Sequence, residues 1–179
     1  MTRILGLSGS LRKGSYNTAL LRAAAGATPE GVEIEIGSIA GVPLYNADDE
    51  ARDGLPEAVV TLQKQLAAAD GLLLVTPEYN NGVPGVFKNA LDWMSRGDGG
   101  AAFRDKPVAV MGASPGGFGT VLAQAHWLPV LRTLGTRPWF GQKLMVSRAG
   151  KVFDDSGALA DEAIRDQLRS FLAGFATSL

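Results

Sequence analysis

The sequence contains no cysteine and only one histidine, His126. Without cysteine, the chain can form no disulfide scaffold, no thiolate metal site and no thiol nucleophile. A single histidine likewise excludes metal sites that are built from several imidazoles. Any redox chemistry would therefore have to be carried by a bound cofactor.

Long apolar runs and an excess of one charge are also missing. No apolar stretch approaches the about 18 residues that a membrane-spanning helix needs. The apolar run Ile4–Leu7 is too short for the hydrophobic segment of a signal peptide. The net charge is −1 and no run of Lys and Arg occurs, so nothing favours nucleic acid or an anionic membrane as a partner. We expect a cytoplasmic protein.

Strand-like and helix-like patterns alternate through the 179 residues. The expected strands are residues 3–8, 33–39, 70–76 and 106–111, and a last strand is expected in two pieces, 136–140 and 144–147, broken at Gly141. The expected helices are residues 15–27, 56–69, 84–95, 118–134 and 159–179, and residues 41–54 are expected to be a loop. Five strands alternating with helices predict a parallel sheet covered on both faces, an α/β three-layer sandwich with a single domain over residues 1–179.

The loop after the first strand has the composition of a phosphate site. It contains small hydrogen-bonding side chains and one guanidinium group, at Ser10, Arg12, Ser15, Asn17 and Thr18. The free N–H groups of the helix that follows also favour an anion. A simple helix N-cap at Ser15 is the alternative. The spacing from Gly9 to Ser15 lacks the lysine of a P-loop, which argues against a nucleoside triphosphatase.

Two further loops follow the third and fourth strands, where ligands bind in sheets of this type. The first of them contains Pro77, Glu78, Tyr79 and Asn80, which offer a flat aromatic face and amide groups suited to a planar heterocycle. The second contains Ser114, Gly116 and Gly117, and its glycines allow backbone to approach a ligand closely. The alternatives are a rigid turn for the former and a flexible connection for the latter.

The three loops carry a resemblance. The segments GSLRKGSYNT, TPEYNNGVPGVFKNALDW and GASPGGFGT strongly resemble the NADPH-dependent FMN reductase family, including its chromate- and quinone-reductase-like members. The resemblance implies a flavodoxin-like fold with strand order 2-1-3-4-5 and bound FMN. It also implies electron transfer from NADPH or NADH, by a ping-pong scheme, to a small acceptor such as a quinone, a flavin, an azo compound or chromate.

The resemblance also assigns roles to residues. Ser10, Arg12, Ser15, Asn17 and Thr18 would hold the FMN phosphate. Pro77, Glu78, Tyr79 and Asn80 would contact the ring edge and the ribityl chain, and Ser114, Gly116 and Gly117 would close over the far side of the ring. No protein acid or base would be catalytic. A homodimer or homotetramer is implied, with Pro43–Asp53 and Asn81–Trp93 at or near the contact, so Lys88, Asn89, Asp92 and Trp93 would be structural or interfacial.

Three different functions stay open beside this one. Gly112-Ala113-Ser114-Pro115-Gly116 matches a nucleophile elbow and would make the protein a serine hydrolase. Pro115 has no N–H for an oxyanion hole, and His126 falls in a predicted helix, where we expect it to be half buried. The chain could also be a non-enzymatic electron carrier or flavin-binding regulator, or an interaction protein that has lost the flavin.

Overall fold

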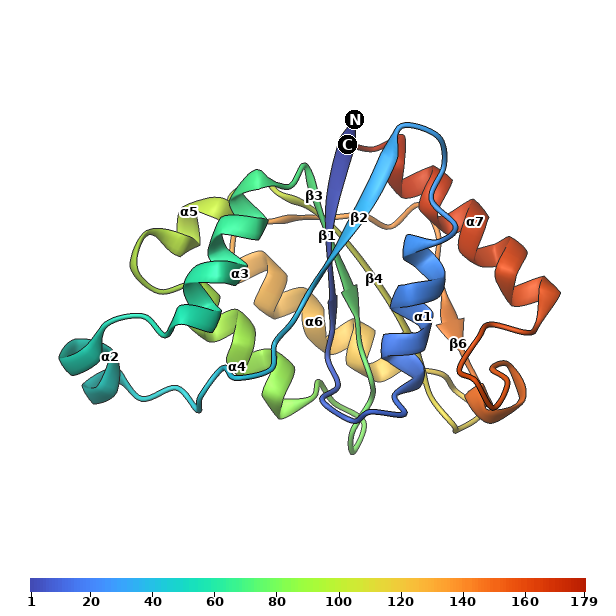
Figure 1. The fold of residues 1–179 in the computed structure, drawn as a ribbon, viewed down its shortest axis with the longest axis horizontal. Coiled ribbons are helices and arrows are strands. Elements are labelled where there is room, and N and C mark those ends of the chain that lie inside the picture. Colours follow the sequence, from blue (N-terminus) through green and yellow to red (C-terminus); the bar gives the residue numbers. More distant parts are fainter.

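A parallel sheet forms the centre of the computed structural model, which describes residues 1–179 (Figure 1). Its strands lie in the order β2-β1-β3-β4-β5, with a short sixth strand, β6, also paired to β4. The strands are β1 (Thr2–Ser8), β2 (Val32–Gly37), β3 (Gly71–Val75), β4 (Pro107–Ala113), β5 (Arg137–Pro138) and β6 (Met145–Val146). The flavodoxin-like order that the resemblance implied is therefore confirmed.

Helices cover both faces of the sheet (Figure 1). One face packs against α1 (Tyr16–Ala25) and α7 (Glu162–Ala176), and the other packs against α3 (Glu57–Ala68), α4 (Gly85–Met94) and α6 (Val121–Thr133). Strand residues alternate between the two cores: Leu73 packs on the side of α1 and α7, and Leu72 and Leu74 pack on the side of α3, α4 and α6. This double burial explains the uniformly apolar sequence of β3. No helix combines the length and the apolar composition that crossing a bilayer would need.

The interrupted final strand is present, and its two pieces pair with different ends of β4. Residues 137–138 pair with Pro107 and Val108, and residues 145–146 pair with Gly112 and Ala113. The intervening chain, residues 139–144, leaves the sheet and contains the expected break at Gly141. The outer edge of β4 is consequently left without a strand partner over residues 109–111.

Several local features differ from the expectations. The expected loop 41–54 contains a helix, α2 (Ala47–Asp53), whose N-cap Asn46 accepts a hydrogen bond from the backbone of Asp48. Acidic residues in its first turn further favour the helix. Three short helical turns also occur, at η1 (Gly97–Gly99), α5 (Gly100–Phe103) and η2 (Ala149–Lys151). His126 was expected to be half buried, but it is exposed because it lies on the outer face of α6.

Candidate functional site

The three loops with unusual composition leave the sheet side by side, at its lower edge in Figure 1. The backbone N–H of Gly9, after β1, donates to the carbonyl of Val75 at 2.9 Å. The N–H of Thr76, after β3, donates to the carbonyl of Met111 in β4 at 2.8 Å. The parallel register therefore brings together loops that lie far apart in the sequence, and this edge is the candidate site.

The first loop presents cations that have no acidic partner. A cavity of about 260 Å³ beside it is lined by Ser10, Arg12, Lys13 and Thr18, among others, and by Arg22 of α1. None of these three cationic side chains takes part in an ion pair of the structure. Ser15 caps α1 by accepting a hydrogen bond from the N–H of Thr18 at 3.3 Å. Free cations near the N-terminus of a helix suit a phosphate group.

Asn17 belongs to the same loop but its side chain faces β4. Its amide nitrogen donates to the carbonyl of Ala113 at 2.9 Å, and its amide oxygen accepts from the N–H of Ala113 at 2.8 Å. β3 ends at Val75, two residues before it could pair with Ala113, so the Asn17 amide takes the place of the missing strand. The side chain thereby holds the first loop against the third.

The second loop is a tight hairpin that is fastened to α6. Tyr79 and Gly82 exchange two backbone hydrogen bonds of 3.1 and 3.0 Å, and Asn80 and Asn81 have φ values of +49° and +61°. These angles are those of a type I′ turn, which Asn-Asn-Gly accommodates well. The Tyr79 side chain is 52% exposed and stands free beside the turn.

Glu78 fastens this loop. Its carboxylate accepts hydrogen bonds of 2.9 Å from the N–H groups of Leu122 and Ala123, at the start of α6. The helix has no cap from its own N-cap residue, Thr120, so Glu78 satisfies its free N–H groups from another loop. The resemblance implied that Asn17 and Glu78 contact the ligand. In the structure, both side chains form hydrogen bonds with backbone groups of other segments.

The third loop is held to β6 and η2 by backbone hydrogen bonds. Ser114 donates to Val146 at 2.9 Å and accepts from Ala149 at 3.0 Å, and Gly116 accepts from Arg148 at 2.9 Å. A side chain at Gly117 would meet no other atom within 4 Å, so the space beside this residue is open. The loop therefore offers a firm backbone surface to a flat ligand. The pairing of β6 with β4 places Arg148 beside the third loop. No pattern in the sequence predicted this position for Arg148.

The hydrolase alternative lacks its catalytic pair. The Ser114 hydroxyl accepts a hydrogen bond from the N–H of Gly116 and has no hydrogen bond to an imidazole. His126 instead lies beside the second loop, where a Cβ on Gly82 would come within 3.7 Å of its Nδ1 atom. Nucleophilic catalysis needs the base within hydrogen-bond reach of the nucleophile. The donor set fits a phosphorylated ligand with a planar ring better than an acyl substrate.

Comparisons with known proteins agree with this chemistry. The model of the NADPH-dependent FMN reductase family matches residues 2–151. The chain is 46% identical over 170 residues to an NAD(P)H-dependent FMN reductase of Pseudomonas aeruginosa. This alignment covers 95% of this chain and 91% of that protein. It is 38% identical over 168 residues to a 2-hydroxy-1,4-benzoquinone reductase of a Burkholderia species, over 94% of this chain and 91% of that protein. A solved flavoenzyme NAD(P)H:(acceptor) oxidoreductase from Paracoccus denitrificans aligns with a TM-score of 0.87 and 32% identity, over 99% of this chain and 96% of that one.

Proposed function

The chain belongs to the NADPH-dependent FMN reductase family, and from this membership we propose that it binds FMN at the three loops and reduces a small acceptor with NAD(P)H. The observation that carries the proposal is a group of cations that form no ion pair. Arg12 and Lys13 lie in the loop that precedes α1, and Arg22, from the last turn of α1, lines the same cavity. A phosphate monoester, with up to two negative charges, would pair with cations of this group. We propose a quinone as the acceptor, since one relative is named a 2-hydroxy-1,4-benzoquinone reductase.

Each loop would make a distinct contribution to binding. Ser10, Arg12, Ser15 and Thr18 would hold the phosphate through hydroxyl and guanidinium groups. Pro77, Tyr79 and Asn80 would border the ring edge and the ribityl chain, and Ser114, Gly116 and Gly117 would lie along the far side of the ring. Asn17 and Glu78 would act on the ligand through the loops that their side chains position. We propose no catalytic acid or base among the side chains.

FMN, when bound, supplies the capacity to accept a hydride and to release the electrons in a later step. The protein would orient the ring and stabilise charge on it through backbone N–H groups of the second and third loops. The open space beside Gly117 would admit the nicotinamide and then the acceptor in turn. Use of one space by both substrates would give ping-pong kinetics.

We also propose a single-domain cytoplasmic protein that forms a homodimer or homotetramer through residues 43–53 and 81–93. Asn89 and Trp93 of α4 both donate hydrogen bonds to the carbonyl of Pro43, at 2.8 and 2.9 Å. The neighbouring Leu44 is 82% exposed. The two hydrogen bonds to Pro43 fix the backbone next to this apolar side chain, which faces solvent. Light scattering should show an oligomer for the wild-type protein and a smaller species for Leu44→Glu. An unchanged mass would place the contact elsewhere.

The proposed activity is tested by absorbance. The purified protein, as isolated or after incubation with FMN, should be yellow, should bleach anaerobically with NADPH or NADH, and should turn over with a benzoquinone. A protein that FMN does not reconstitute would refute flavin binding, and bleaching without steady-state turnover would instead indicate an electron carrier.

The position of the phosphate is tested by substitution. Arg12→Ala removes a charge-assisted contact, which is worth about 1.5–3 kcal/mol and so should weaken FMN binding about tenfold or more. Arg104→Ala is the matched control, because Arg104 is an exposed residue at the end of α5, outside the three loops. Equal FMN affinity of the two variants would show that the phosphate site is misplaced.

A further inference from the structure

A second cavity lies along the outer edge of β4, where the last strand is interrupted. The hydrogen bond from the Trp139 N–H to the Val108 carbonyl, 2.7 Å, marks one end of the gap. The bond from the Gly112 N–H to the Leu144 carbonyl, 3.2 Å, marks the other. Val110 lies between them and has no strand partner on this edge. The backbone carbonyl of Met111 accepts a hydrogen bond from Thr76, on the β3 side of β4. Backbone groups of successive residues in a strand point to opposite sides, so the N–H and C=O of Val110 face the gap.

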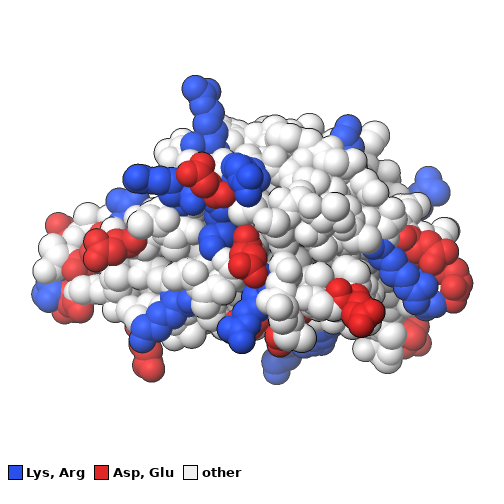
Figure 2. Space-filling view, turned by 90° about the horizontal axis from the view of Figure 1, so that it is seen from above, with Lys and Arg blue, Asp and Glu red and all other residues white.

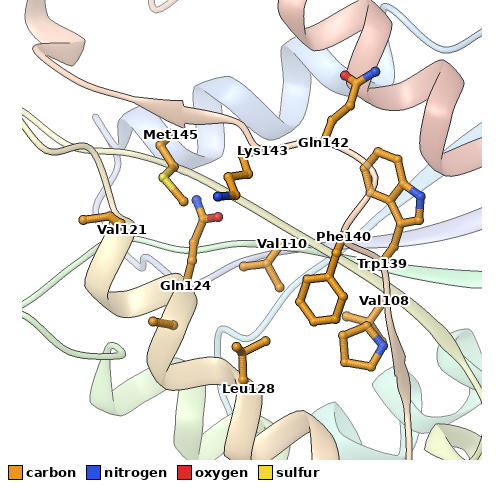
Figure 3. A pocket seen from close by; sticks show the side chains of 12 residues that line it. Val108, Val110, Val121, Gln124, Leu128, Trp139, Phe140, Gln142, Lys143 and Met145 are labelled. Carbon is orange, nitrogen blue, oxygen red and sulfur yellow. The ribbon is translucent and has the colours of Figure 1, made fainter.

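The cavity measures about 280 Å³ and its walls are mainly apolar (Figure 3). Val121, Ala125 and Leu128 of α6 form one wall. Trp139 and Phe140, from the segment that leaves the sheet, form the facing wall. The volume is close to the lower end of the about 300–1,000 Å³ range of ligand pockets, which favours an occupant of one or two rings.

One cation points into this apolar space. In Figure 3 the Lys143 amine is turned toward the interior of the cavity, next to the Gln124 side chain. Lys143 forms no ion pair, and no Asp or Glu is among the residues that line the cavity. Gln124 uses its amide nitrogen on Thr120 and on the Leu144 carbonyl, and Gln142 donates to Ser170 outside the cavity.

The charged side chains in the space-filling view of Figure 2 are scattered over the face it shows, with both signs interspersed. An anion would therefore not be drawn to that face as a whole.

We propose that this cavity is a binding site for a small planar aromatic carboxylate. Its rings would lie between α6 and the Trp139–Phe140 wall, and its carboxylate would meet the Lys143 ammonium. The free N–H of Val110 is a second donor on the floor of the cavity. An anion is the complementary occupant because Lys143 supplies the only charge in the lining.

The site is separate from the proposed flavin site. None of its lining residues belongs to the three loops at residues 8–18, 76–85 and 112–120. Binding here therefore needs no FMN and no turnover, and the two proposals fail independently.

The test is calorimetric titration of the FMN-saturated protein with 2-naphthoate and with the neutral analogue 2-naphthamide. The wild-type protein should prefer the acid about tenfold, which is the typical weight of a charge-assisted contact. Lys143→Met should remove this preference, and Ala125→Phe, at an exposed lining position of α6, should abolish binding by filling the cavity. Lys64→Met is the control, since Lys64 lies on α3 and does not line the cavity.

Three outcomes would overturn the proposal. Equal binding of the acid and the amide by the wild-type protein would exclude recognition of charge. Displacement of 2-naphthoate by excess NADP would place it at the three loops. Absence of 2-naphthoate binding, together with a smaller mass of Ala125→Phe in light scattering, would show that a second copy of the chain covers the cavity.

Discussion

The Asn17 side chain should stabilise the fold, and Asn17→Ala isolates its contribution. Both of its hydrogen bonds go to the backbone of Ala113, and the two residues are 4% and 2% exposed. The substitution leaves one buried N–H and one buried C=O without partners, each at a cost of about 1–3 kcal/mol. We expect the free energy of unfolding to fall by about 2–6 kcal/mol, toward the lower end if water enters the space. A chain of this size loses roughly 2–4 °C in Tm per kcal/mol.

The assay is urea and thermal unfolding of the protein without FMN. Thr61→Ala, at an exposed position of α3, is the control and should change stability by no more than about 0.5 kcal/mol. If Asn17→Ala left the stability of the FMN-free protein unchanged but weakened FMN binding, the amide would act on the ligand and the structural reasoning would be refuted.

Asn17→Asp adds a pH-dependent version of the same test. The carboxylate can accept from the Ala113 N–H, but it opposes the Ala113 carbonyl unless it is protonated. The folded-state pKa of the introduced carboxyl should therefore be raised above its unfolded value. A raised folded pKa contributes stability below the unfolded pKa that is lost as the pH rises through the folded pKa. The stability deficit relative to wild type should shrink from about pH 8 to about pH 4, near the unfolded pKa of Asp.

Three further predictions concern the loops and one turn. Glu78→Ala should lower the free energy of unfolding in urea by about 1 kcal/mol, because α6 loses its cap, and Glu78→Gln should lower it less. Gly112→Ala should abolish FMN retention, since the new Cβ would lie 2.2 Å from the carbonyl oxygen of Thr76, and normal flavin content would contradict this. A hydrogen bond from Ser156 holds the pKa of Asp154 below its ordinary value, so its turn should lose stability only as the pH falls through that lowered pKa. Tm profiles from about pH 5 to about pH 2 should show a smaller acid loss in Asp154→Ala than in the wild type, because only the contribution of this carboxylate is removed.

Local patterns in the sequence sufficed for most of the fold. The apolar run at residues 70–76 and the two-piece pattern at 136–147 both correspond to strands, β3 and the pair β5 and β6. The helix at 47–53 was missed although Asn46 and the acidic residues after it are ordinary N-terminal signals. Its neighbours Pro43 and Gly54 favoured a loop instead.

The site was predictable in position and less so in detail. The three loops could be located because each follows a strand whose carboxyl end reaches the same edge of the sheet. The contacts of Asn17 and Glu78 could not be foreseen, since their partners are 96 and 44 residues away or more. The second cavity was also missed, because it depends on a gap in strand pairing.

The amino-acid sequence alone determined which segments become strands, helices and turns, because periodicity, capping and turn preferences act over a few neighbouring residues. It also determined which loops carry polar and cationic groups. Only the tertiary structure decided which of those groups are free and which are engaged with backbone. The reason is that the pairing of β4 with β3, β5 and β6 sets where each strand ends, which leaves Ala113 to pair with Asn17 and leaves Val110 without a strand partner on its outer edge. Glu78 is engaged because the second loop meets the start of α6.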